Sequence, residues 1–173
     1  MEKSTASSLS NCPVARSLDR IGESWSLLIL RDCFAGFSRF DDFQKNLGIA
    51  PNMLSRRLNL LVEEGLLERR QYKEKPPRFE YVLTPRGRDI RPVLHSLLAW
   101  GNKHFADEGS SMILVNRATG IEADPVLVDR VTGQIIAEGD YVTVAGPAAS
   151  ENMRQRLAGI PQRLEALNAK KPT

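Results

Sequence analysis

Apolar residues in the first part of the chain recur every three or four positions, the spacing that places side chains on one face of an α-helix. The first such positions are Val14, Leu18, Ile21, Trp25, Leu28 and Ile29. Gly22 and the capping residue Ser24 interrupt this pattern, so we expect two helices, at about 13–21 and 25–34. Residues 1–10 have no periodic pattern and are expected to form a flexible tail.

Two more helices follow, joined by the short segment GIA. Ser38 is expected to cap a helix at about 39–47, and Gly48 to end it. Pro51 suits the first turn of a helix at about 51–63, because a proline there sacrifices no intrahelical hydrogen bond.

The helix at 51–63 has two unlike faces. One arc carries Leu54, Leu58, Leu61 and Val62. The opposite arc carries Asn52, Ser55, Arg56, Asn59 and Glu63. Such a polar face can simply meet water, as on most surface helices, or it can contact a partner.

After Gly65 the period changes from 3.6 to 2 in the segments around 69–72 and 79–83, which is typical of strands. Between them lies KEKPPR, whose two prolines cannot occupy a central strand. We therefore expect a β-hairpin with a basic, proline-stiffened tip.

Thr84 and Pro85 supply a cap and a first turn for a helix at about 86–105. The apolar stripe of that helix is too broad for a free surface. It consists of Ile90, Val93, Leu94, Leu97, Leu98, Gly101 and Phe105.

The composition changes at 107–111, and beyond it NRATG and DRVTG recur thirteen residues apart, each flanked by β-prone runs. We expect a small β-meander here, followed by a helix. The helical pattern consists of Met153, Leu157, Ile160, Leu164 and Leu167, interrupted by Pro161. The predicted organisation is a tail (1–10), a main domain (11–106) and a β-rich accessory region (107–173).

Charge is unevenly distributed along the chain. Residues 39–91 contain 12 Lys and Arg against 8 Asp and Glu, whereas residues 106–173 contain 7 against 9. The modest basic excess therefore lies around the helix at 51–63, as an anionic partner would require. The sequence contains no run of 18 apolar residues, so no membrane span is predicted. Its first residues lack the pattern of a secretory signal. Two cysteines are too few for a disulfide framework. These features lead us to expect a cytoplasmic protein.

The order helix, tight turn, helix, hairpin predicts an α+β fold of the winged helix-turn-helix type. A major groove admits one helix, whose exposed side chains must donate to and accept from base edges. We expect the polar face of the helix to contact bases, and the basic hairpin to contact phosphates or enter the minor groove. Arg57 lies nearer the apolar arc, and its side chain could swing out to a phosphate. The candidate DNA-binding residues are Ser38, Arg39, Pro51, Asn52, Ser55, Arg56, Arg57, Asn59, Lys73, Lys75 and Arg78.

Three stretches resemble the HxlR family of bacterial transcription regulators, relatives of the MarR group. They are CPVARSLDRIGESWSLLILRDCFAGFSRFDDF, LSRRLNLLVEEGLLERRQYKEKPPRFEYVLTPRG and LLAWG, within about residues 11–105. The resemblance implies a homodimer that binds a pseudo-palindromic operator in double-stranded DNA. It also implies that the first helix and the helix after the hairpin form the dimer.

A regulator needs a signal to respond to, and the sequence leaves two kinds of signal possible. The resemblance implies that Cys12 can be a redox sensor, and the helix beginning at Pro13 could lower its thiol pKa; alternatively Cys12 is an unreactive helix-entry residue. A small-molecule effector could instead occupy a pocket lined by Trp25, Phe34, Phe37 and Trp100, although aromatics at helical spacing are more often core. Cys33 is expected in the core.

No enzyme signature occurs, neither a phosphate-binding glycine loop nor G-x-S-x-G nor H-E-x-x-H. Beyond His104 no cysteine or histidine remains for zinc, so no metal or cofactor is expected. The competing interpretation is a winged-helix protein-interaction scaffold that does not bind DNA.

Overall fold

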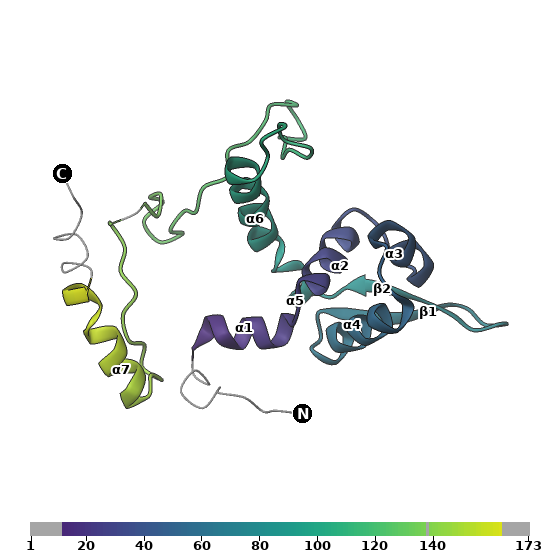
Figure 1. Ribbon diagram of the computed structural model, residues 1–173, viewed down its shortest axis with the longest axis horizontal. Coiled ribbons are helices and arrows are strands. Elements are labelled where there is room, and N and C mark those ends of the chain that lie inside the picture. Colours follow the sequence, from purple (N-terminus) through teal and green to yellow (C-terminus); the bar gives the residue numbers. More distant parts are fainter. Residues whose placement is uncertain (1–11, 138, 164–173) are drawn as a thin grey trace. The chain divides into compact units, whose positions relative to one another are not determined.

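The computed structural model describes residues 12–137 and 139–163. The chain forms two compact units, one made of Arg20–Val126 and one made of the described residues on either side of it. The helices and strands below are labelled in Figure 1.

Four short helices open the described chain, where the apolar spacing predicts them: α1 (Pro13–Ile21), α2 (Ser24–Phe34), α3 (Phe40–Leu47) and α4 (Pro51–Glu63). Gly48 ends α3 with φ 62°, a left-handed conformation that a glycine adopts without a steric penalty. Two expected caps are wrong. Glu23 and Arg39 occupy the N-cap positions of α2 and α3, and neither donates or accepts a side-chain capping hydrogen bond.

The predicted hairpin is the antiparallel pair β1 (Leu67–Lys73) and β2 (Arg78–Leu83), with Leu67 opposite Leu83 and an irregularity between Gln71 and Lys73. Arg39 adds a single bridge to Glu80 on the other side of β2. In Figure 1 the hairpin extends away from α3 and α4, as a wing does. This is the winged helix-turn-helix fold that the order of elements predicts.

One hydrophobic core holds α2, α3, α4 and the root of the hairpin together. Its buried members are Ile29, Leu30, Phe43, Ile49, Leu54, Leu58, Leu61, Leu66, Leu67 and Tyr81. The leucines of α4 lie in this core, so the apolar arc of the helix is fixed inward and its polar arc must face outward.

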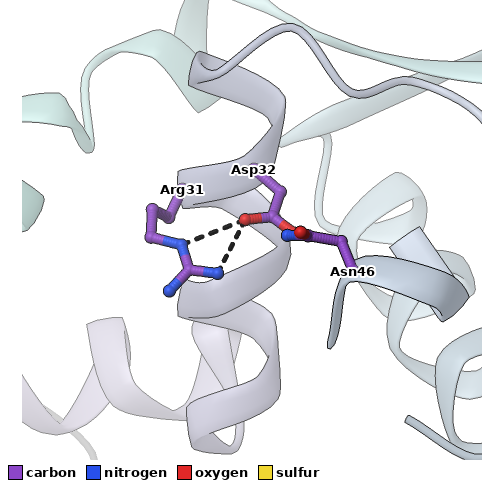
Figure 2. A network of polar contacts seen from close by, with 3 residues as sticks. All are labelled: Arg31, Asp32 and Asn46. Atoms are coloured by element: carbon purple, nitrogen blue, oxygen red, sulfur yellow. Dashed lines mark hydrogen bonds and ion pairs between the residues drawn. The ribbon is translucent and has the colours of Figure 1, made fainter. Parts of the chain in front are cut away.

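A buried carboxylate sets the relation between α2 and α3. Asp32, only 2% exposed, accepts hydrogen bonds from Arg31 at 2.8 and 3.0 Å through Oδ1 and from Asn46 Nδ2 at 2.7 Å through Oδ2 (Figure 2). Hydrogen bonds to a charged acceptor are stronger than neutral ones. The end of α2 is therefore tied to the end of α3, which orients the helix-turn-helix.

The single helix predicted at 86–105 is wrong, because the chain forms α5 (Pro85–Arg88) and then α6 (Arg91–His104). Thr84 does cap α5, since its Oγ1 accepts a hydrogen bond from Gly87 N at 3.0 Å. The break precedes Pro92, in the first turn of α6, where the missing N–H is tolerated. Gly87 lies so close to the hairpin root that a Cβ there would overlap the carbonyl oxygen of Leu66.

The accessory region is less regular than the β-meander we predicted. Each repeated turn closes one isolated bridge, Val115 with Glu122 and Val128 with Ile135, rather than extended strands. Asn116 Oδ1 and Asp129 Oδ1 accept backbone hydrogen bonds inside their own turns, so side chains rather than long ladders hold these turns. Helix α7 (Glu151–Ala158) follows, while the predicted tail at 1–10 and the positions Leu164 and Leu167 lie outside the described residues.

Candidate nucleic-acid interface

The polar face of α4 is presented to solvent. The leucines at 54, 58 and 61 are fully buried, whereas the side chains on the opposite arc are exposed. The exposed set comprises Asn52, Ser55, Arg56 and Asn59, and Pro51, also exposed, forms the first residue of the helix. These side chains offer amide, hydroxyl and guanidinium groups, which can donate to or accept from base edges.

Arg57 differs from the other candidate DNA-binding residues of α4, because its side chain is buried. It is 5% exposed, forms an ion pair with Glu23 and contacts Met53 Sδ at 3.9 Å. Its Nε has no hydrogen-bond partner among the described residues. The Arg57 side chain therefore contacts Glu23 and Met53 in this structure, and a phosphate contact would require it to leave these partners.

The two candidates before α3 differ in their surroundings. Ser38 is half-buried, its carbonyl oxygen accepts a hydrogen bond from Tyr81 N at 2.7 Å, and its Oγ lies 3.4 Å from Glu80 Oε2. Ser38 is therefore mainly part of the sheet edge. Arg39 is exposed, with its guanidinium 4.8 Å from the centre of the Tyr72 ring.

The wing presents its cations to solvent. Lys73, Lys75 and Arg78 are all exposed around the turn that joins β1 to β2. Arg70 is instead held by Glu68, with Nε and Oε1 3.2 Å apart, which partly neutralises it. Arg69 is not among the predicted DNA-binding residues, although the sequence places it in a basic strand. Its guanidinium lies 3.6 Å from the centre of the Phe79 ring.

The two cysteines have opposite properties. The backbone N–H of Ala15 in the first turn of α1 lowers the pKa of the Cys12 thiol. Burial raises the pKa of Cys33 to about 12, and the nearby Asp32 carboxylate adds to the effect. Cys33 packs against the core as expected, and the pKa of Cys12 is the lower of the two.

The four aromatic residues that we expected to line an effector pocket have different surroundings within the described chain. Trp25 and Phe37 pack against the core, and Phe34 lies 5.4 Å below the guanidinium of Arg91. Trp100 is 56% exposed, and the centroid of its ring lies 4.8 Å from that of the Phe105 ring. Trp100 lines a different cavity, of about 580 Å³, between α6 and residues 110–125.

Among the described residues, no cluster of three or more His, Cys, Asp or Glu side chains has the arrangement of a metal site. None of the helices in that same part of the chain has the length and apolar character needed to span a membrane.

Comparisons with known proteins give the same fold and a family. The profile of HxlR-like helix-turn-helix proteins matches residues 20–109. The uncharacterized HTH-type transcriptional regulator Rv3095 of Mycobacterium tuberculosis is 40% identical over 135 residues, which is 78% of this chain and 85% of that protein. YdeP of Bacillus subtilis, also an uncharacterized HTH-type transcriptional regulator, is 38% identical over 54% of this chain and 73% of its own length.

Solved structures extend the similarity. PA1374 of Pseudomonas aeruginosa, a candidate transcription factor, is 51% identical over 84% of this chain and all of its own, with a TM-score of 0.61. The redox regulator HypR in its reduced form is 32% identical over 54% of this chain and 94% of its own, with a TM-score of 0.51. With its helix-turn-helix, its wing and these relatives, the chain belongs to the HxlR-like helix-turn-helix family of transcriptional regulators, which are not enzymes.

Proposed function

We propose that the protein acts as a homodimer on a pseudo-palindromic operator, with α4 in the major groove and the wing on the backbone or in the minor groove. The observation that carries this proposal is the division of α4. Its leucines are buried in the core, while Asn52, Ser55, Arg56 and Asn59 remain exposed along one face.

The chemistry of this face suits base recognition. An arginine can donate two hydrogen bonds to guanine, and an asparagine can pair with adenine through its amide. In helix-turn-helix proteins the N-terminal part of the second helix contacts the bases. Asn52, Ser55 and Arg56 lie in that part of α4.

The apolar face of α6 supports the proposal of a dimer. Val93, Leu97 and Trp100 follow one another at helical spacing and are 47%, 43% and 56% exposed. Apolar side chains in such a row are stabilised when a second surface covers them. A symmetric dimer would present two copies of α4, and two half-sites about 34 Å apart place them in successive major grooves.

Cys12 is the proposed redox input of this regulator. Its thiol has a lowered pKa, which favours the reactive thiolate, and the similar protein HypR is a redox regulator. The proposed consequence is that oxidation of Cys12 changes operator affinity.

Fluorescence anisotropy tests the DNA-binding proposal. The full chain is titrated against the duplex upstream of its own coding sequence and against a scrambled duplex of equal length, over a series of salt concentrations. We expect at least tenfold tighter binding to the natural duplex and a steep loss of affinity with salt, because phosphate contacts release counterions. Absence of salt-dependent binding to either duplex would contradict the proposal and favour the protein-interaction scaffold.

A further inference from the structure

Three arginines and four aromatic residues line one hollow at the junction of the wing and α3. Arg39, Arg69 and Arg78 line it together with Tyr72 and Phe79, and its volume is about 290 Å³. This arginine hollow joins residues on both strands of the wing to the residue that precedes α3. It is at the lower end of the size of small-molecule pockets, which leaves room for a single small anionic group.

The positive charge of the arginine hollow is largely uncompensated. None of its three guanidiniums forms an ion pair with a carboxylate of the described chain, whereas the neighbouring Arg70 is held by Glu68. Asp41 also lines the hollow and is the one carboxylate there among the described residues. The site therefore keeps a net positive charge, which attracts an anion.

Two of the guanidiniums are already oriented. The guanidinium of Arg69 lies over the Phe79 ring at 3.6 Å, and that of Arg39 lies over the Tyr72 ring at 4.8 Å. A ring attracts the face of a guanidinium, while the N–H groups around its edge stay available as donors. Side chains held in this way lose less rotamer freedom when they bind, so an anion is bound at a lower entropic cost.

We infer that the arginine hollow holds one phosphodiester group of the bound DNA, with Arg69 as a phosphate-contacting residue beside Arg39 and Arg78. Its contacts would be independent of base sequence, because a phosphate carries no sequence information. The inference rests on the proposed function, and it adds Arg69 to the binding surface.

The test compares two adjacent arginines on the same strand. Arg69→Gln removes a guanidinium from the hollow, and Arg70→Gln, the matched control, removes the one that Glu68 already partly neutralises. Both side chains are exposed, and thermal unfolding verifies that each variant folds. Affinity for the natural and the scrambled duplex is then measured over the same salt series, and each variant is also titrated with pyrophosphate.

We expect Arg69→Gln to bind both duplexes about tenfold more weakly, as loss of a charged hydrogen bond does. It should also reduce the slope of log affinity against log salt by about 1 per bound protomer. Arg70→Gln should change the slope much less.

An unchanged affinity and slope in Arg69→Gln, with normal binding by the unmodified protein, would overturn this inference and leave the proposed function intact. Failure of the unmodified protein to bind any duplex would overturn both. Pyrophosphate binding that Arg69→Gln abolishes while the DNA slope stays constant would assign the hollow to a free phosphate compound and overturn the assignment to DNA.

Discussion

Arg56 and Arg57 are neighbours in the sequence, yet their guanidiniums lie in opposite surroundings. Arg56 is exposed on the polar face of α4, whereas Arg57 is buried and paired with Glu23. Successive side chains of an α-helix point in directions about 100° apart around its axis. Identical residue types can therefore serve recognition and packing side by side.

Replacement of Arg56 by alanine tests recognition by a single residue. We expect Arg56→Ala to weaken operator binding by about 1–3 kcal/mol and to relax the preference at one base position, since a bidentate contact discriminates one base pair. Lys75→Ala, at the wing tip, is the comparison and should weaken all sequences nearly equally. Anisotropy against a set of duplexes with single base changes measures both. A uniform loss for Arg56→Ala would place its side chain on the backbone instead.

The two thiols should differ in reactivity. The pKa of Cys12 is lowered and that of Cys33 is raised to about 12, so near pH 7.5 Cys12 contains the larger fraction of thiolate. Brief treatment with iodoacetamide, followed by peptide mass analysis, should show alkylation at Cys12 and little at Cys33. In urea the two should react at similar rates. Faster alkylation of Cys33 in the folded protein would contradict this prediction.

At the scale of elements, two ion pairs connect α4 to the end of α1 and the turn that follows. Glu23 pairs with the buried Arg57, and Arg20 contacts Glu64 Oε2 at 2.7 Å. The pairs differ in which partner is buried. The Arg57 side chain is 6% exposed and that of Glu23 61%, whereas the Arg20 side chain is 60% exposed and that of Glu64 18%. A buried cation without its partner costs more than an exposed one.

We therefore expect Glu23→Gln to lower the free energy of unfolding by about 1–3 kcal/mol, because a buried charge loses its partner. Glu64→Gln should cost about 0–1 kcal/mol, since Arg20 remains solvated. Urea denaturation measures both. The salt dependence of DNA binding should stay unchanged in Glu23→Gln, because Arg57 is internal; a reduced slope would instead indicate that Arg57 contacts a phosphate.

The sequence predicted most elements and the exposed face of α4, because the periods of apolar residues are local and strong. Long-range polar contacts were not predicted. Asp32 is a charged residue among the core positions of α2, but its partner Asn46 lies fourteen residues away in another helix. The break between α5 and α6 was missed because the apolar stripe continues through it. The accessory region was predicted as strands from β-prone composition, whereas its turns close only single bridges.

At the scale of the whole molecule, dimerisation should decide whether the operator is bound. A charge at the centre of the exposed apolar row of α6 would be desolvated in the proposed interface. We expect Leu97→Glu to shift the protein from twice the chain mass of 19.3 kDa to the single chain, and to weaken operator binding at least tenfold.

Ser96→Glu is the comparison, because it adds the same charge at the flank of this row, where we expect a smaller effect on the mass. Light scattering after gel filtration measures the mass of each variant. A dimeric Leu97→Glu protein with normal operator affinity would place the interface elsewhere.

The separation of buried leucines from exposed polar side chains on α4 also bears on how such a regulator could change its target. Substitutions at Asn52, Ser55 or Asn59 alter exposed side chains and leave the buried leucines untouched. Exposed substitutions usually change stability by no more than about 0.5 kcal/mol. If α4 reads the operator as proposed, we expect new operator preferences to be accessible one residue at a time, by natural variation or in a designed library, with little loss of stability at Ser55 and Asn59.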